Sequence, residues 1–374
     1  MMLVKLKELF RQRVELLRNF IKENDFDGLI LSRCDNFSWF TFGARNHITL
    51  NSETGDAHVL LTEENIYILT NNIEKERLRK EEFHDDLLPE VEFAEYIWSK
   101  DMTDVLKPFV SGKKFASDTG RFETICVKDM LDQYRYVLTE FELNTYRTLG
   151  KLCDESVNHV MAKINPEMRE IEVQGMVASA LIEKGIEPIF VMVSGEESAK
   201  LYRHNLSRNV KLGDKVFVSI CARKRGLVIS LTRSVLFKKD TNVIEQHKQN
   251  CYVDAVAITN SKPGVKLNQV LDKIRKAYAE IGRPYEWMLH HQGGITGYNA
   301  REIIAKEWTD YTLCFGNAVA WNPTITGTKS EDTVLITEKG LEIISYPQTS
   351  NWPFIEFEID GQIIRRPDIL LANV

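Results

Sequence analysis

Hydrophobic residues recur every three or four positions in several stretches of the chain, the spacing that places them along one face of a helix. This pattern predicts helices over residues 3–23, 140–165, 170–184 and 267–281. Gly185 directly follows the third of these stretches and is expected to end that helix as a glycine C-cap. Short runs rich in β-branched and aromatic residues lie between the helices and predict strands. The chain is therefore expected to have a mixed α/β (α+β) fold.

Two of the predicted strands form a hairpin in the second half of the chain. Residues 216–222 and 227–237 are rich in β-branched residues, and the connection between them ends in Gly226. A short polar connection with a glycine that tolerates positive φ favours an antiparallel pair. Because side chains alternate along a strand, Ser219 and Cys221 are expected to share a face.

The pattern changes from strands to long helical periodicity near residues 137–140. A chain of 374 residues also exceeds the size up to which a single hydrophobic core keeps growing. Two domains are therefore expected, a small α/β domain over residues 1–137 and a larger domain over residues 138–374.

Composition excludes several classes of protein. With 43% hydrophobic and 27% charged residues the chain resembles an ordinary globular protein, and its net charge of −6 argues against a nucleic-acid partner. No apolar run approaches the length of a membrane span and no signal sequence opens the chain, so we expect a cytoplasmic protein with no membrane partner. Six cysteines without CxxC pairs indicate neither a disulfide framework nor a zinc ribbon.

Four segments of the C-terminal half carry distinctive strings, among them His290-His291-Gln292-Gly293-Gly294 and Glu331-Asp332-Thr333-Val334-Leu335. In order and spacing the segments over residues 213–237, 290–302, 316–323 and 331–340 resemble the active-site strands of the pita-bread superfamily. This superfamily holds methionine aminopeptidase, aminopeptidase P, prolidase and creatinase. The helix, strand and Phe-Ser-Trp-Phe string before Gly43 are similar to the opening of the creatinase-type N-terminal domain. The resemblance implies a creatinase-like two-domain architecture with a C-terminal pita-bread catalytic-type domain.

The resemblance also implies where a metal centre would lie. In the metal-dependent members two Asp, one His and two Glu hold a pair of divalent ions, and the matching positions here are Ser219, Ser230, Gly294, Asn322 and Glu331. A single carboxylate would leave about three positive charges unbalanced, at a cost of several kcal/mol per desolvated ion, and a glycine offers no ligand atom. We therefore expect no metal and no cofactor at these positions.

Three residues that remain are the expected catalytic groups: His204, His290 and Glu331. The resemblance to creatinase, which works without metal, implies that His204 acts as a general acid or base, a role that suits an imidazole. A carboxylate facing a cavity without metal is expected either to have a raised pKa or to pair with a cation. The residues expected to bind substrate surround these three in the motifs: His291, Tyr298, Arg301, Asn322, Ser219 and Ser230.

Two further residues have open roles. Lys329 is a candidate to replace the lost positive charge, although an exposed lysine is the default expectation. Cys221 is a candidate nucleophile, although a buried inert thiol is the commoner situation.

Three functions fit the sequence. The first is a metal-independent, creatinase-like hydrolase or lyase that acts on a C–N bond of a small amide-type or guanidino-type substrate. The second is a catalytically inactive binding protein, and the third is a dimetal Xaa-Pro dipeptidase or aminopeptidase. The substrate is expected to be a small molecule or short peptide. The resemblance to creatinase also implies a symmetric homodimer.

Overall fold

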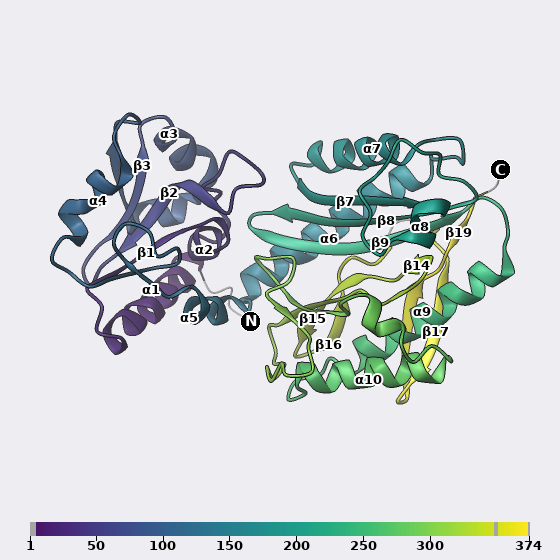
Figure 1. Cartoon of the computed structure of the whole chain (residues 1–374). Coiled ribbons are helices and arrows are strands. Elements are labelled where there is room, and N and C mark those ends of the chain that lie inside the picture. The colour runs from purple at the N-terminus through teal and green to yellow at the C-terminus, as the bar shows by residue number, and fades with distance from the viewer. Residues whose placement is uncertain (1–4, 348–350, 373–374) are drawn as a thin grey trace. The chain divides into compact units, whose positions relative to one another are not determined.

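The computed structural model describes residues 5–347 and 351–372. The chain divides into two compact units, which Figure 1 shows coloured along the sequence. The first comprises Met1–Arg135 and Arg225–Leu227, and the second comprises Tyr136–Lys224 and Val228–Val374. Both mix helices with sheets, which confirms the predicted fold class.

The first unit is built on one six-stranded sheet with the order β4-β3-β2-β1-β5-β6. Its helices and strands are, in chain order, α1 (Leu6–Glu23), β1 (Gly28–Arg33), α2 (Cys34–Phe40), β2 (Thr54–Leu61), β3 (Ile66–Asn71), α3 (Lys75–Arg77), η1 (Leu78–Glu82), η2 (Asp85–Glu90), β4 (Glu92–Tyr96), α4 (Met102–Val110), β5 (Phe115–Ser117), β6 (Ile125–Cys126), α5 (Lys128–Asp132) and η3 (Gln133–Arg135). β1 pairs antiparallel with β2 and parallel with β5.

The predicted first helix is confirmed, apart from residues 3–4, which lie outside the described residues. It buries one face that includes Phe10, Val14 and Leu17, as the spacing of its apolar residues requires. On the sheet, Ile30 of β1 packs in one core cluster with Leu106 of α4.

The second unit contains four sheets, with the strand orders β11-β10-β12-β15-β16, β19-β9-β8-β7, β13-β14 and β17-β18. Its helices and strands are α6 (Glu140–Met161), α7 (Glu170–Ile182), β7 (Glu187–Gly195), α8 (Glu196–Leu201), β8 (Lys215–Lys224), β9 (Leu227–Leu236), α9 (Thr241–Thr259), α10 (Leu267–Glu280), η4 (Glu286–Leu289), β10 (Gly293–Thr296), β11 (Ile303–Ile304), β12 (Ala318–Trp321), β13 (Thr324–Ile325), β14 (Thr328–Lys329), β15 (Asp332–Thr337), β16 (Gly340–Ile343), β17 (Phe354–Ile359), β18 (Gln362–Pro367) and β19 (Leu370–Leu371).

Helices cover the two larger sheets of this unit. α6 and α7 pack on each other and on the sheet that contains β7 and β8 (Figure 1). α9 and α10 pack on the five-stranded sheet, where Val253 and Ile274 share a core cluster with Trp321 and Val334. Within residues 5–347 and 351–372, none of the helices combines the length and the hydropathy that crossing a bilayer requires.

The predicted hairpin is present as β8 and β9, which are neighbours in one sheet. Arg225 and Gly226 connect them, and both have positive φ, of 51° and 79°. A two-residue turn of this kind needs positive φ at both positions, which glycine adopts without strain. The hairpin thereby brings Ser219 and Ser230 onto adjacent strands of the second unit.

Candidate functional site

A buried carboxylate held by two cations lies at the centre of the predicted site. Lys329 places its Nζ 2.8 Å from Glu331 Oε2, and the two side chains are each 3% exposed. Arg301 donates from Nη2 to the other oxygen, Glu331 Oε1, at 2.9 Å. Two cations and one carboxylate leave a net charge of +1 in this cluster.

Strand alternation explains how Glu331 and Lys329 reach the same place. Residues two apart in extended chain share a face, so Lys329 and Glu331 face the cluster while Ser330 and Asp332 face the other way. On that other face Ser330 donates to Asp254 at 2.6 Å, and Arg366 lies 2.7 Å from Asp332. The buried ion pairs behind the strand therefore fix the position of Glu331.

Hydroxyl groups from the β8–β9 hairpin complete the surroundings of Glu331. Thr232 donates to Glu331 Oε2 at 3.0 Å and lies 2.7 Å from the Ser219 hydroxyl. Arg301 donates from Nη1 to Ser230 Oγ at 3.1 Å, so both serines at the predicted positions hydrogen bond within the cluster. Cys221 lies 3.4 Å from Ser230, and burial followed by the negative charge of Glu331 raises the pKa of its thiol. This environment does not favour the thiolate that a nucleophile requires.

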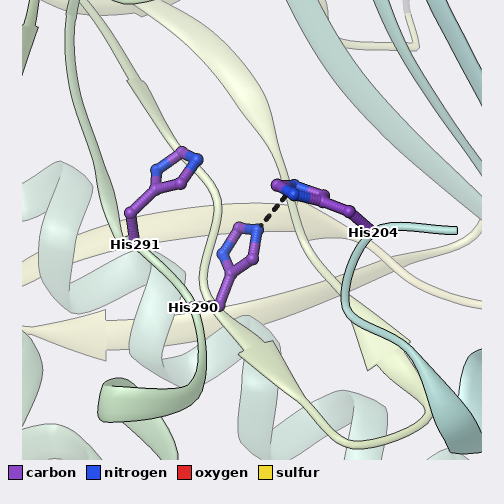
Figure 2. A group of neighbouring side chains, drawn as sticks. All are labelled: His204, His290 and His291. Carbon is purple, nitrogen blue, oxygen red and sulfur yellow. Dashed lines mark hydrogen bonds between the residues drawn. The ribbon is translucent and has the colours of Figure 1, made fainter.

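Three histidines lie together (Figure 2), close enough to Lys329 and Glu331 for these charges to act on their pKa values. His204 belongs to the loop after α8, whereas His290 and His291 follow η4. The Nε2 atoms of His204 and His290 are 2.9 Å apart, and the rings of His290 and His291 stack with centroids 4.5 Å apart. His290 is only 8% exposed, whereas His204 is exposed.

Burial and the neighbouring cations keep these rings neutral. Burial, together with the charge of Lys329, lowers the pKa of His290 to about 2 and also lowers the pKa of His204. Burial and Arg301 lower the pKa of His291 to about 4. Glu331 differs: burial opposes its ionisation, but Lys329 and Arg301 outweigh burial and lower its pKa to about 2. At neutral pH the three imidazoles are therefore neutral, while Glu331 stays ionised.

The residues present do not fit the two-metal centre of the superfamily. The backbone at Gly294 has a φ of +152°, and a Cβ there would lie 2.0 Å from the carbonyl oxygen of Ile303. No histidine can therefore occupy this position unless the backbone shifts. Glu331, the carboxylate expected at one of the five positions, is already bound to Lys329 and Arg301, which occupy the oxygens that a metal would need.

Several buried polar atoms at the site lack a hydrogen-bond partner among the described residues: Nδ1 of His290, Nδ1 of His291, Nε of Arg301 and Oδ1 of Asn322. A buried polar group without a partner is costly, and most such groups are paired with protein or water. The group of atoms includes both donors and an acceptor. Such a set can hydrogen bond to a ligand that carries an amide-like group and an acceptor oxygen.

The structure brings most of the predicted site residues together: His204, His290, His291, Arg301, Glu331, Ser219 and Ser230. Tyr298 is a different case, because its hydroxyl donates to Glu142 of α6 at 2.6 Å and its ring is buried. The sequence analysis did not identify Thr232 as a hydrogen-bond donor to Glu331, and it gave Lys329 no firm role. The Lys-x-Glu spacing directly before a strand is the signal that could have indicated the ion pair.

Comparison with known proteins places this geometry in a family. The sequence pattern of metallopeptidase family M24 matches residues 144–338, and that of the creatinase/prolidase N-terminal domain matches residues 13–154. The chain belongs to metallopeptidase family M24, and the predicted membership of the pita-bread superfamily with its creatinase-like two-domain architecture is confirmed.

Two relatives and one solved structure illustrate the likeness. The Xaa-Pro dipeptidase of Pyrococcus furiosus is 22% identical over 88% of this chain and 96% of its own length. The protein YkvY of Bacillus subtilis, which carries the description "putative dipeptidase", is 26% identical over 62% of this chain and 66% of its own length. The structure of the prolidase from Pyrococcus horikoshii OT3 superposes with a TM-score of 0.77 and 19% identity, covering 90% of this chain and 99% of that one. At these identities the superposition shows a shared fold.

Proposed function

We propose that this M24 family protein is a metal-independent, creatinase-like hydrolase that cleaves a C–N bond of a small amide-type substrate carrying an anionic group. The proposal keeps the prolidase-like character of the family but replaces the chemistry of its two-metal centre with acid–base chemistry by His204 and His290. The residue types at the five metal positions support it, because serine, glycine and asparagine side chains do not neutralise a pair of divalent ions.

The observation that carries the proposal is the 2.9 Å contact between the Nε2 atoms of His204 and His290. Of two neutral rings in this contact, one supplies the N–H and the other the lone pair. One imidazole takes a proton from water while the water oxygen bonds to the substrate carbonyl carbon. A proton from the histidine pair passes to the leaving nitrogen as the C–N bond breaks, and the proton taken from water restores the pair.

The net charge of the cluster selects the substrate. Lys329 and Arg301 together exceed the single negative charge of Glu331, and Arg301 Nε is a buried donor without a partner among the described residues. An anionic group of the substrate, or the negative charge that develops on its carbonyl oxygen, would be stabilised there. A cationic guanidino group would be repelled. Of the two substrate types expected from the sequence, the amide type is therefore favoured over the guanidino type. In this scheme Glu331 holds the two cations in place and does not transfer protons.

The test is turnover after metal removal. Protein dialysed against a chelator would be incubated with a panel of N-acyl amino acids and Xaa-Pro dipeptides, each beside its carboxamide analogue as the uncharged control. We expect hydrolysis of a carboxylate-bearing amide that the chelator does not reduce, and slower hydrolysis of the matched carboxamide. Activity that disappears with the chelator and returns with manganese, zinc or cobalt would favour the dimetal peptidase instead. Tight binding of an acidic amide without turnover would favour a binding protein.

We further propose that the protein works in the cytoplasm as a symmetric homodimer. All six cysteines are free, which suits a reducing compartment. C2 dimers are the commonest oligomers of soluble proteins. Sedimentation equilibrium at micromolar concentration tests the dimer, and a monomer there would contradict it.

A further inference from the structure

The three histidines beside Glu331 have the arrangement of a metal-ligand set. His204, His290 and His291 each offer a ring nitrogen, and these three atoms lie within 4.8 Å of one another. Figure 2 shows that the three rings approach one another from two separate loops. Among the residues the structure describes, this is the one group of three or more His, Cys, Asp or Glu side chains with such a spacing.

The distances suit a single ion bound by imidazole. Zinc binds histidine nitrogen at about 2.0–2.1 Å in tetrahedral geometry, so two ring nitrogens on one ion lie about 3.3 Å apart. The Nε2 atoms of His204 and His290 are 2.9 Å apart, and a small rotation of the exposed His204 brings them to that separation. The ion would take the place of the proton that the two rings now share. That proton can move to Nδ1 of the same ring, because a neutral imidazole carries one proton on either nitrogen.

A second observation is that the Nδ1 atoms of two of these rings make no hydrogen bond with the described protein. His290 is 8% exposed, yet its Nδ1 has no hydrogen-bond partner within the described part of the chain, and neither has Nδ1 of the neighbouring His291. Two imidazoles stacked in contact with a third, without hydrogen bonds to carbonyls or carboxylates, gain little from being there as structural groups. Coordination of one ion gives all three rings a common partner.

This set is distinct from the metal positions of the superfamily. None of the three histidines matches those five positions, which hold Ser219, Ser230, Gly294, Asn322 and Glu331. The charge next to it also limits what can bind. Lys329 and Arg301 add a net +1 after Glu331 is counted, so the ion must bring a negatively charged fourth ligand such as hydroxide or chloride. Because His204 is exposed, that ligand can come from solvent.

We propose that His204, His290 and His291 bind one transition-metal ion that prefers imidazole, such as Zn²⁺ or Cu²⁺, and that the bound ion inhibits the hydrolysis. The inhibition rests on the proposed function, because the ion occupies the Nε2 atoms that transfer protons in that scheme. The binding itself rests on the three-histidine geometry alone. Hard ions such as Mg²⁺ and Ca²⁺ prefer oxygen ligands and are not expected to bind here.

Binding is tested without substrate. Chelator-treated full-length protein would be titrated with Zn²⁺ by calorimetry, and with Co²⁺ by visible absorption, whose intensity distinguishes tetrahedral nitrogen ligation from the hexaaqua ion. We expect one ion per chain. His204→Ala and His291→Ala should each lower the affinity for the ion by about 100-fold, because even the loss of a group that hydrogen bonds to a metal ligand lowers affinity by about 10–100-fold. His159→Ala is the matched control, because His159 is an exposed histidine of α6 outside the group, and it should bind as the unsubstituted protein does. No binding by the unsubstituted protein, or equal binding by His291→Ala, would overturn the site.

The effect on turnover is measured separately, so that the two proposals can fail independently. Addition of Zn²⁺ to the chelator-treated enzyme should abolish hydrolysis at the concentration at which calorimetry shows one ion bound. Mg²⁺ at the same concentration should have no effect. If the ion binds and hydrolysis is unchanged, the inhibition is refuted while the binding site stands. If the ion binds and hydrolysis begins only then, the site stands and the metal-independent function is refuted.

Discussion

Lys329 and Glu331 form a buried ion pair in a protein whose relatives are metallopeptidases, with Nζ and Oε2 2.8 Å apart and each side chain 3% exposed. Together with Arg301, Lys329 supplies two positive charges beside this single carboxylate. The two side-chain cations exceed the single negative charge of Glu331 and leave the cluster with a net charge of +1.

Glu331→Gln should strongly destabilise the protein, because the substitution leaves Lys329 and Arg301 buried without a counter-charge. Removing one partner of a buried ion pair typically costs about 3–5 kcal/mol. Urea denaturation at pH 7 would measure this loss. Glu338→Gln, at an exposed position of the same segment, is the matched control and should change the free energy of unfolding by no more than about 0.5 kcal/mol. Equal effects of the two substitutions would contradict the buried pair.

The same pair predicts how stability depends on pH. The pKa of Glu331 falls to about 2 in the folded protein, below that of an unperturbed glutamate at about 4.3. Its contribution to stability is therefore present above the unfolded pKa and is lost as the pH falls through the folded pKa. The difference in unfolding free energy between the unsubstituted protein and Glu331→Gln should be constant from pH 7 to about 5 and shrink as the pH falls toward 2. A difference that grows on acidification would refute the assigned direction.

His204→Ala should reduce turnover of the true substrate by about 10²–10⁴, the usual effect of losing a general acid or base. Because His204 is exposed, the substitution should leave the melting temperature nearly unchanged. His159→Ala controls for the loss of an exposed histidine elsewhere and should retain full turnover. A His204→Ala enzyme that turns over normally would remove the histidine pair from the mechanism.

Gly294→Ala should destabilise the protein more than Gly282→Ala, although both glycines have positive φ. At Gly294 the new Cβ would lie 2.0 Å from the Ile303 carbonyl oxygen, whereas at Gly282 no atom lies within 4 Å. Strain from positive φ costs about 1–3 kcal/mol in each case, and overpacking adds about 1–3 kcal/mol at Gly294 only. Thermal denaturation of the two variants would compare these costs, and equal melting temperatures would contradict the clash.

The sequence predicted those helices that bury one face, because their hydrophobic residues recur at regular helical spacing. α1 and α10 bury a regular stripe, and both lie close to their predicted ranges. α9 was missed, because it buries polar residues such as His247, Asn250 and Asp254 along with its apolar ones and so loses the periodic signal. The two-domain fold was predicted correctly from the order and spacing of motifs, which local propensity alone does not provide.

The sequence predicted which residues form the candidate site better than it predicted their ion pairs and pKa values. The spacing of motifs predicted that His204, His290 and Glu331 approach one another, and the contact of His204 with His290 agrees. The pairing of Arg301 with Glu331, 30 residues away in sequence, depends on how β10 and β15 are placed in the sheet and has no local signal. The low pKa of Glu331 follows from that pairing. Glu331, expected from the sequence to be a catalytic group, is therefore assigned no proton transfer in the function proposed above.

The buried ion pairs behind Glu331 also bear on the order in which the protein acquires its structure during synthesis. Arg366 of β18 lies 2.6 Å from Asp254 and 2.7 Å from Asp332, and all three side chains are almost completely buried. Until the ribosome has added residue 366, Asp254 and Asp332 lack the positive charge of Arg366. Burying the two aspartates before then is unfavourable. The segment that carries Glu331, directly before β15, should therefore become fixed only late, when most of the chain has already left the ribosome.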